Sequence, residues 1–387
     1  MNKSKGSDYM NTYEKIILEN KEFIDETWQK IDQKMQVVAP RNANKLPSTS
    51  KNGVYNDHSE DMPDAWTNGF WPGMMWLMYA GTKNDVYKDI AIHGEELLEK
   101  CAEDFDLLYH DVGFMWHISS GAHYRITGDK KAKSRAMYMA ASLSSRYNMN
   151  TGCIRAFQEQ ERESMVIIDS MMNLPLLYWA SEETNDPRFS LVAQSHADTC
   201  IKNHLRPDGS VNHILDYDIR TGELLGIHKG QGTGEPDSAW TRGTAWALYG
   251  YTLSYIHTGK EEYLTTAKNV AHFFMANVSQ NDYIPQYDFR QSYDCKDVDS
   301  SAGAIAACGL IELAKIVPEN EKAMYLNCAI KMVKALTEQY ADLTTDEDAL
   351  LRGVAASPVV LDVTNVFGDY YYLESIYKLK GFEPMFW

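Results

Sequence analysis

Positive charge is scarce in this sequence. Its 387 residues include 37 lysines and arginines against 54 aspartates and glutamates, and the formal net charge is -17 at pH 7. Binding to nucleic-acid phosphates requires a positive field, and no basic stripe offsets the deficit. The composition therefore argues against a nucleic-acid partner. An anionic substrate would have to be held by individual cations, and Arg242, which lies in an aromatic segment, is a candidate.

Long apolar runs are also absent. No segment approaches the roughly 20 apolar residues that a membrane-spanning helix needs. Residues 1–8 carry early charges with no apolar stretch behind them, which fits neither a signal peptide nor an anchor. The six cysteines are scattered without a C-x-x-C pair, as expected for reduced, buried thiols. We therefore expect a cytoplasmic protein with no membrane partner.

Several catalytic signatures are missing. The 11 histidines include no H-E-x-x-H and no helical pairing with a carboxylate, so we expect no metal site. No G-x-S-x-G elbow is present for a nucleophilic serine. The segment 231–246 is rich in glycine near its start, but it lacks the G-x-x-x-x-G-K pattern and follows no predicted strand. We therefore expect neither nucleotide binding nor a cofactor.

Aromatic residues, in contrast, are abundant. They make up 12% of the chain, with nine Trp and 24 Tyr. Sugar-binding clefts use aromatic faces because the C–H side of a pyranose packs well on them. A tyrosine-rich helical core would give the same composition, so the count alone leaves both interpretations open.

The chain is predicted to be almost entirely helical. Strand signals are sparse, whereas helical periodicity recurs, for example at Ala267, Val270, Phe273 and Phe274. Short polar turns separate consecutive helical stretches and carry the Gly, Asn, Asp or Pro residues that end and start helices. About twelve helical stretches are predicted by this periodicity: 11–34, 68–81, 84–103, 113–126, 130–147, 165–181, 187–204, 238–257, 260–278, 299–316, 320–340 and 368–379.

Six helical hairpins favour an all-α fold, an (α/α)6 barrel formed as one domain by residues 1–387. In such a ring each hairpin buries one face against its neighbours, and closure removes exposed ends. Long polar segments then lie between the hairpins, and long loops in a compact domain are often functional. We expect these segments to cover one mouth of the barrel: 36–64, 205–237, 279–298 and 342–366.

The segment from Tyr109 to Phe114 contains the first candidate carboxylate, Asp111, directly before a predicted helix. Aspartate is a favoured N-cap residue, so helix capping explains Asp111 without a catalytic role. A functional carboxylate is the alternative interpretation.

Asp169 is the second candidate. It lies in a predicted helix whose apolar positions are Met165, Ile168, Met172 and Leu176, so its carboxylate is expected to point toward the buried side. An unpaired buried carboxylate is costly, and the side chain must therefore be paired, protonated or exposed to a polar cavity. That cost favours a functional role. Two carboxylates that face a barrel centre suit glycosidic acid and base chemistry.

Three further segments offer side chains for binding a sugar. Trp66 and Phe70 stand at the start of a helix beside glycines that allow close approach of a ligand, although core packing explains them equally well. His213 lies in a loop, where a lone histidine is usually only solvated. Arg242 and Trp246 are four residues apart on a helix, which puts a planar cation and an aromatic plate on one face as a clamp for an acidic sugar.

Taken together, these segments resemble the unsaturated glucuronyl hydrolases of glycoside hydrolase family 88, and more distantly the unsaturated rhamnogalacturonyl hydrolases. The likeness runs from about Trp66 to the stretch Gly368-Asp-Tyr-Tyr-Tyr-Leu-Glu and includes Asp297-Val-Asp-Ser-Ser-Ala-Gly-Ala. Members of the family fold as six-hairpin helical barrels. They remove the 4,5-unsaturated uronic acid that polysaccharide lyases leave at a non-reducing end. The resemblance therefore implies an unsaturated uronic-acid oligosaccharide as the substrate.

The resemblance also implies residue roles. Asp169, in Ile-Asp-Ser-Met-Met-Asn, matches the general acid and base, and Asp111, in His-Asp-Val-Gly-Phe, matches a second essential carboxylate near the sugar hydroxyls. The implied substrate-binding residues are Trp66 and Trp246 as stacking plates and His213, Gln231 and Arg242 as polar contacts, and the same motifs add Phe70 and His110.

The implied reaction is hydration of the enol ether in the unsaturated sugar. Asp169 protonates C4, water attacks the cation at C5, the same carboxylate takes a proton from that water, and the hemiketal opens to expel the aglycon. Neither a metal nor an organic cofactor is required. Asp111 and the substrate carboxylate are expected to raise the pKa of Asp169. The alternatives are conventional glycoside hydrolysis or a rhamnogalacturonyl-type hydrolase on the same barrel, and a non-catalytic sugar-binding protein.

One loop departs from the family pattern. Members that favour sulfated fragments carry Ser and Lys positions before Gly368, whereas residues 352–363 contain no Lys. The sequence therefore does not predict a preference for sulfated disaccharides, nor does it choose among parent polysaccharides. A monomer or a weak homo-oligomer is expected.

Overall fold

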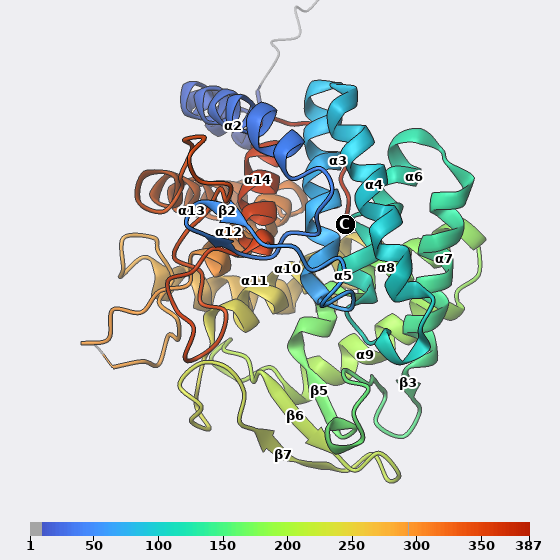
Figure 1. Cartoon of the computed structure of the whole chain (residues 1–387). Coiled ribbons are helices and arrows are strands. Elements are labelled where there is room, and N and C mark those ends of the chain that lie inside the picture. Colours follow the sequence, from blue (N-terminus) through green and yellow to red (C-terminus); the bar gives the residue numbers. More distant parts are fainter. Residues whose placement is uncertain (1–9, 293) are drawn as a thin grey trace, which may run out of the picture.

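The computed structural model describes residues 10–292 and 294–387, and its helices close into a ring (Figure 1). Neighbouring inner helices contact one another around the ring, with α3 and α5 joined through the 3-10 turn η1 (Trp66–Gly69). The inner helices are α3 (Phe70–Thr82), α5 (Val112–His117), α8 (Leu174–Thr184), α10 (Thr241–Thr258), α12 (Ser300–Ile316) and α14 (Val366–Leu379).

Each inner helix pairs with an outer one, which completes six hairpins and confirms the predicted barrel. Four pairs are consecutive in the chain and α5 pairs with α7 across the short helix α6, whereas α14 closes the ring against α2 from the opposite end of the sequence. The outer helices are α2 (Lys21–Arg41), α4 (Asp85–Ala102), α7 (Lys130–Ser145), α9 (Arg188–Asn203), α11 (Glu261–Val278) and α13 (Glu319–Gln339); two short helices, α1 (Thr12–Glu19) and α6 (Ser120–Thr127), flank the ring.

Composition explains which helices lie inside. Nearly every residue of α10 and α12 is buried, and a helix that is apolar or small on all sides must be enclosed. The outer helices α4 and α9 bury only one stripe each. The hairpin turns are those that the sequence predicts: Asn84 caps the start of α4, and Gly128 and Gly259 end helices in the left-handed conformation.

The predicted helix 165–181 is wrong over its first residues. Residues Met165–Ile167 form strand β5, which pairs with β6 (Ile214–Tyr217), and β6 in turn pairs with β7 (Leu224–His228), all antiparallel. A 3-10 turn, η4 (Ile168–Met172), follows before α8 begins. Two further hairpins were also not predicted: β1 (Ser50–Lys51) with β2 (Val54–Tyr55), and β3 (Tyr147–Asn148) with β4 (Cys153–Ile154).

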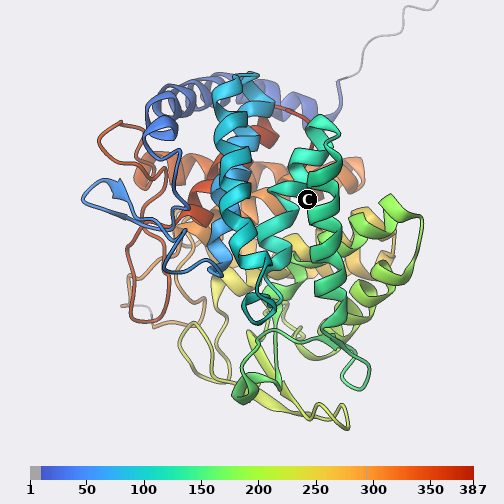
Figure 2. The same ribbon diagram turned by 45° about the vertical axis from the view of Figure 1, so that its right-hand side comes forward.

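The β5–β7 sheet lies at one end of the barrel, below the helices in the views of Figures 1 and 2. Long loops gather at this end, as the sequence predicts. The predicted helix 113–126 is also interrupted, because Ser119 leaves helical geometry between α5 and α6. None of the helices in the described chain combines the length and apolarity needed to cross a bilayer.

The chain ends inside the barrel. Trp387 is 5% exposed, stacks on Tyr371 with ring centroids 6.1 Å apart, and meets the edge of Phe114. Because Phe114 also lines the large pocket described below, this side chain supports the wall of that pocket from behind.

Candidate active site

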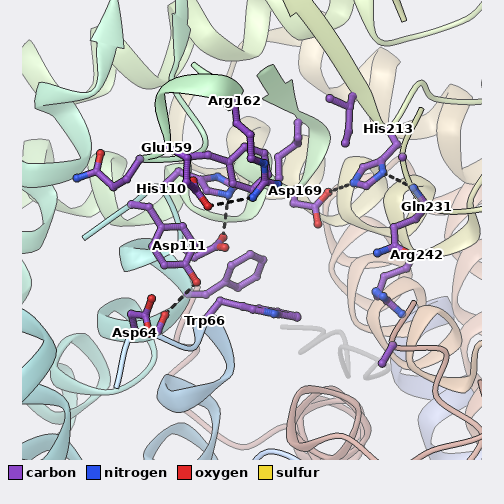
Figure 3. A pocket seen from close by; sticks show the side chains of 18 of the residues that line it. Asp64, Trp66, His110, Asp111, Glu159, Arg162, Asp169, His213, Gln231 and Arg242 are labelled. Atoms are coloured by element: carbon purple, nitrogen blue, oxygen red, sulfur yellow. Dashed lines mark hydrogen bonds and ion pairs between the residues drawn. The ribbon is translucent and has the colours of Figure 1, made fainter. Parts of the chain in front are cut away.

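A pocket of about 590 Å³ opens at the end of the barrel where the inner helices begin (Figure 3). The start of α5 and the start of α10 both reach it, so the positive ends of two helix dipoles face the cavity. Three of the four predicted loop segments contribute: Ala356 from 342–366, and His213, Ile214, Gly230 and Gln231 from 205–237, while 36–64 contributes Asp64. Segments 106–111 and 157–169 complete the walls.

Asp169 lines this pocket from the 3-10 turn η4, not from the apolar stripe of a helix. The strand β5 ends at Ile167, and the backbone N–H of Ile168 donates to the carbonyl of His213 at 3.0 Å. That bond extends the pairing of β5 with β6 by one residue and so fixes the backbone position of Asp169. The predicted position of Asp169 within a helix is therefore wrong, although its side chain does line a polar cavity.

His213 is the nearest partner of Asp169. Its Nε2 lies 3.4 Å from Oδ1 of Asp169, which is otherwise buried without a hydrogen-bond partner among the described residues. The backbone N–H of Gln231 donates to Nδ1 of His213 at 3.0 Å. Three of the predicted residues thus form one chain of contacts along a single side of the pocket (Figure 3).

Opposing influences set the pKa of Asp169. Burial raises the pKa, but the hydrogen-bonding contact and charge of His213, followed by the charges of His110 and Arg242, outweigh it and hold the pKa below the usual range. Without substrate, the carboxyl group is therefore ionised at neutral pH. The expected increase in its pKa is not present in the free protein.

Asp111 occupies the N-cap position of α5, yet its side chain makes no capping bond. Asn173 takes over that role, because its Oδ1 accepts from the backbone N–H of Phe114 at 2.8 Å. The amide of Asn173 also donates to Oδ1 of Asp111 at 3.0 Å. Capping therefore does not explain the carboxylate of Asp111, which lines the pocket.

His110 is fully buried beside Asp111. Its Nδ1 lies 2.9 Å from Oγ of Ser170, and its Nε2 lies 3.4 Å from Oδ1 of Asp111. Because Ser170 directly follows Asp169, this contact connects the two carboxylate-bearing segments. On this side of the pocket, opposite His213 and Arg242, lie Asp64, Trp66, His110 and Asp111 (Figure 3).

Arg242 is 4% exposed and lies at the start of α10. One of its terminal nitrogens pairs with Asp299 and donates to the carbonyl of Ala355 at 2.6 Å. The other guanidinium nitrogens make no hydrogen bond with the described residues, so they remain available to a ligand. Asp299, within the segment that carried part of the family resemblance, therefore anchors the cation.

The expected clamp of Arg242 and Trp246 does not form. The guanidinium carbon lies 4.7 Å above the ring of Trp240, whereas Trp246 is buried below the pocket wall against Phe114. Trp240 lines the pocket and its ring centroid is 4.3 Å from that of His213. The aromatic plate on this wall is thus Trp240.

Of the two remaining aromatic candidates, Trp66 and Phe70, only one lines the pocket. Trp66 is partly exposed and lines the pocket. Phe70 is fully buried behind it, with ring centroids 5.6 Å apart, and does not line the cavity. Phe70 therefore supports the plate that Trp66 presents.

Several pocket residues were missed because no local pattern marks them. Phe157 comes from a loop and Arg162 from the 3-10 turn η3 (Gln160–Arg162) that follows it, with the guanidinium of Arg162 stacked over the ring of Phe157. Tyr287 lies outside the pocket lining and holds Gln231 by a 2.9 Å bond from its hydroxyl to Oε1. The part of the chain that the structure describes contains no cluster of three or more side chains suited to a metal ion.

Comparison with known proteins places the chain in a family. The profile of Glycosyl Hydrolase Family 88 matches residues 34–385. An unsaturated glucuronyl hydrolase of Bacillus sp. strain GL1 is 33% identical over 347 residues, which cover 86% of this chain and 90% of that protein. An unsaturated chondroitin disaccharide hydrolase of Streptococcus pneumoniae is 34% identical, with 83% of each chain covered.

The fold is shared with solved structures as well. The crystal structure of an unsaturated glucuronyl hydrolase from Streptococcus agalactiae superimposes with a TM-score of 0.86 at 29% identity, and 100% of both chains is covered. The match of the family profile over almost the whole described barrel, together with these relatives, leaves one assignment: the chain is a glycoside hydrolase that belongs to family 88.

Proposed function

We propose that this protein removes the 4,5-unsaturated glucuronic acid from the non-reducing end of lyase-generated oligosaccharides by hydrating the C4=C5 bond. The single observation that carries the proposal is the arrangement of Asp169, whose side chain lines the pocket and whose buried Oδ1 lies 3.4 Å from Nε2 of His213, with no hydrogen-bond partner among the described residues. The names of the relatives support the substrate class, since they are unsaturated glucuronyl and unsaturated chondroitin disaccharide hydrolases.

The walls of the pocket suit an acidic, unsaturated sugar ring. Trp66 and Trp240 offer aromatic faces for its apolar sides. The free guanidinium nitrogens of Arg242 and the side-chain amide of Gln231 are donors for its carboxylate. Asp111 on the opposite side accepts hydrogen bonds from its hydroxyls.

Chemistry begins when Asp169 donates a proton to C4 of the enol ether. The positive charge that develops is shared between C5 and the ring oxygen, and the ionised carboxylate of Asp169 lies beside it. Water then attacks C5 and gives one proton back to Asp169, so the carboxyl group ends the cycle as it began. The hemiketal formed at C5 opens, which releases the aglycon and the keto sugar.

Asp169 must hold a proton before this step, yet its pKa is lowered in the free protein. The substrate supplies the opposing influence, because a bound carboxylate pairs with Arg242 and adds a negative charge near Asp169. Both effects raise the pKa of Asp169 in the complex. Binding of the acidic sugar thus favours the protonated form of Asp169, which then donates its proton to C4.

The proposed reaction uses side chains alone and needs no metal or organic cofactor. We also propose a cytoplasmic location, since all six cysteines are free thiols. Fractionation of producing cells would test the location, and light scattering of the purified protein would test the expected monomer or weak homo-oligomer.

A panel of lyase-generated unsaturated disaccharides tests the function. We expect the ultraviolet absorbance of the conjugated acid to disappear on at least one of them, and no loss on any would contradict the proposal. Asp169→Asn should abolish the loss, with a rate reduction of at least about 100-fold as for other general acids. The matched control is Asp186→Asn, an exposed aspartate at the turn before α9.

Deuterated water separates hydration from conventional glycoside hydrolysis. Hydration places deuterium at C4 of the released sugar and destroys the double bond. Conventional hydrolysis protonates only the glycosidic oxygen, so the sugar leaves with its double bond intact and takes up deuterium at C4 only afterwards, in solution and on both faces. NMR spectra of the product recorded during turnover distinguish deuterium on one face of C4 from deuterium on both faces.

A further inference from the structure

A second cavity, of about 460 Å³, lies beside the catalytic pocket. The two share Gln158 as a lining residue, and Gln158 donates from its side chain to the carbonyl of Phe105 at 3.2 Å. Residues 105–107 and 157–159 therefore form a ridge, with the catalytic pocket on one side and the second cavity on the other. The mechanism proposed above makes no use of this second cavity.

Two guanidinium groups, those of Arg146 and Arg155, line the second cavity, and neither forms an ion pair with Glu163, the carboxylate in the same lining. Arg146 donates only to neutral acceptors: the side chain of Gln158 and backbone carbonyls that include Leu108 and Phe157. Arg155 donates only to carbonyls of residues 157–159. Within residues 10–292 and 294–387, no carboxylate lies within ion-pair distance of either group.

This arrangement is unusual in a chain with a net charge of -17. Burial and the positive charge of Arg155 lower the pKa of Arg146 to about 10, against the opposing charges of Asp111 and Glu159, and Arg146 is still charged at neutral pH. Two like charges held close to one another are destabilising unless an anion lies between or beside them. With two guanidinium groups and one carboxylate, Glu163, in its lining, the cavity keeps an excess of positive charge, which suits an anion.

The ridge itself carries an exposed aromatic ring. Phe105 is 70% exposed, although a phenylalanine ring is normally buried. It lines the second cavity on the side of the shared Gln158, where a chain leaving the catalytic pocket would cross. A pyranose packs its C–H face on such a ring, so this exposed side chain fits a sugar rather than the core.

We propose that the second cavity binds the next acidic sugar of an unsaturated oligosaccharide longer than a disaccharide, with the intervening sugar packed on Phe105. The proposal rests on the proposed function, which puts the unsaturated end in the catalytic pocket. In a polymer that alternates uronic acid and amino sugar, the second acidic group is two sugars from that end. Arg155 is the principal cation for it, because its Nη1 makes no hydrogen bond with the described residues, whereas all three side-chain nitrogens of Arg146 donate to neighbouring acceptors.

The experiment measures binding, so that it does not depend on turnover. Calorimetry on the Asp169→Asn protein compares an unsulfated unsaturated disaccharide with the corresponding tetrasaccharide. We expect the tetrasaccharide to bind about tenfold more tightly, which corresponds to one well-placed charge or stacking contact. The advantage should shrink as sodium chloride is raised, because an exposed anion contact is screened.

Two substitutions added to the Asp169→Asn protein show which side chains cause the tighter binding of the tetrasaccharide. Phe105→Ala and Arg155→Gln should each remove most of the tetrasaccharide advantage and leave disaccharide binding unchanged, whereas Phe105→Tyr and Arg155→Lys should retain most of it. Matched controls are Tyr138→Ala, which removes an exposed ring of 71% exposure from α7, and Arg188→Gln on α9. A sulfated tetrasaccharide shows whether sulfate strengthens the same contact or whether the uronate carboxylate suffices.

Three results would overturn the proposal. Equal affinity for both lengths in the parent protein would leave the second cavity without a ligand. A loss of disaccharide and tetrasaccharide binding to the same extent in Arg155→Gln would show that Arg155 only shapes the loop. Unchanged tetrasaccharide binding in Phe105→Ala would show that the intervening sugar does not pack on Phe105. Failure of the proposed function is a separate outcome, in which the wild-type protein binds but hydrolyses neither length.

Discussion

The backbone N–H of Gln231 donates a hydrogen bond to Nδ1 of His213 across 3.0 Å. An amide N–H cannot accept, so Nδ1 must be unprotonated and the proton of the imidazole resides on Nε2. That proton faces Oδ1 of Asp169 at 3.4 Å between heavy atoms. The imidazole is thereby fixed as a donor toward the carboxylate, and it favours the ionised form of Asp169.

Replacement of His213 by Ala removes this donor and should raise the pKa of Asp169. If protonated Asp169 starts the reaction, activity falls as pH rises through its pKa. The high-pH limb of kcat/KM should therefore move to higher pH in the variant, while kcat/KM at its optimum falls about tenfold or more from the loss of a hydrogen bond to a charged group.

The control is His228→Ala, a histidine of β7 that contacts Asp216 at 3.0 Å on the sheet and not in the pocket. Its pH profile should match that of the wild type. A profile of His213→Ala that moves to lower pH, or stays in place, would show that His213 does not act on the proton of Asp169.

Asn173 links helix capping to catalysis, since one side chain caps α5 and holds Asp111. Asn173→Asp keeps a capping oxygen but replaces the donor with a second negative charge. We expect kcat/KM to fall at least about tenfold, because the added negative charge repels the carboxylate of Asp111, which turns away from its partner. Thermal unfolding should change much less than activity.

The comparison variant is Asn84→Ala, which removes the N-cap contact of α4 without touching the pocket. It should lower the free energy of unfolding by ~1 kcal/mol and leave kcat/KM unchanged. If Asn173→Asp retains wild-type activity, its contact with Asp111 has only a structural role.

The barrel could be predicted because the sequence signals for its helices and turns lie within a few neighbouring residues. Amphipathic outer helices such as α4 and α9 and short capped turns recur along the chain, and both features depend on residues a few positions apart. The strand β5 could not be predicted in this way. Its three residues are extended because they pair with β6, about fifty residues away, and a three-residue run has no helical or strand period of its own.

The structure brings most of the predicted site residues to one pocket, but through other local elements than the sequence suggests. Asp169 faces the cavity through a strand and a 3-10 turn, not through a helical stripe. The four-residue spacing of Arg242 and Trp246 holds, but α10 is enclosed on all sides, so only residues at its first turn reach the mouth. Trp240, at the N-cap, therefore takes the place that spacing gave to Trp246.

Tyr287 orients the amide of Gln231. Its hydroxyl accepts from the backbone N–H of Gly232 at 3.0 Å and therefore directs its own proton to Oε1 of Gln231 at 2.9 Å. The amide nitrogen is left to face the ligand. Tyr287→Phe should raise KM about threefold to tenfold, the range of one neutral hydrogen bond, with little change in kcat.

Tyr283→Phe is the matched control, because the hydroxyl of Tyr283 contacts Lys331 on the surface and not the pocket. Its kinetic constants should be those of the wild type. A fall in kcat with unchanged KM in Tyr287→Phe would place the role of Tyr287 in the chemical step and contradict its assignment to ligand binding.

Asp369 on α14 should make stability depend on pH. It is fully buried, accepts from the backbone N–H groups of Leu350 and Leu351 at 2.8 and 2.6 Å, and also accepts from the hydroxyl of Tyr55. Burial nevertheless raises its pKa to about 7. The loop that it holds supplies Ala355 to Arg242, so its protonation state matters for the site as well.

A carboxyl group whose pKa is raised on folding favours the folded state fully below its unfolded pKa, and this contribution is lost as pH rises through the folded pKa. The free energy of unfolding should therefore decline between about pH 4 and pH 7, by up to ~4 kcal/mol for this group alone.

Asp369→Asn does not titrate, so urea unfolding across this range should give a flatter profile than the wild type. Asp342→Asn tests the opposite sign. Hydrogen bonds from Thr344 outweigh burial and lower the pKa of Asp342, so its contribution is lost only as pH falls below about 4. Equal slopes for wild type and Asp369→Asn between pH 4 and 7 would mean that Asp369 stays ionised in the folded protein, with Tyr55 and the two backbone N–H groups sufficient to stabilise its charge.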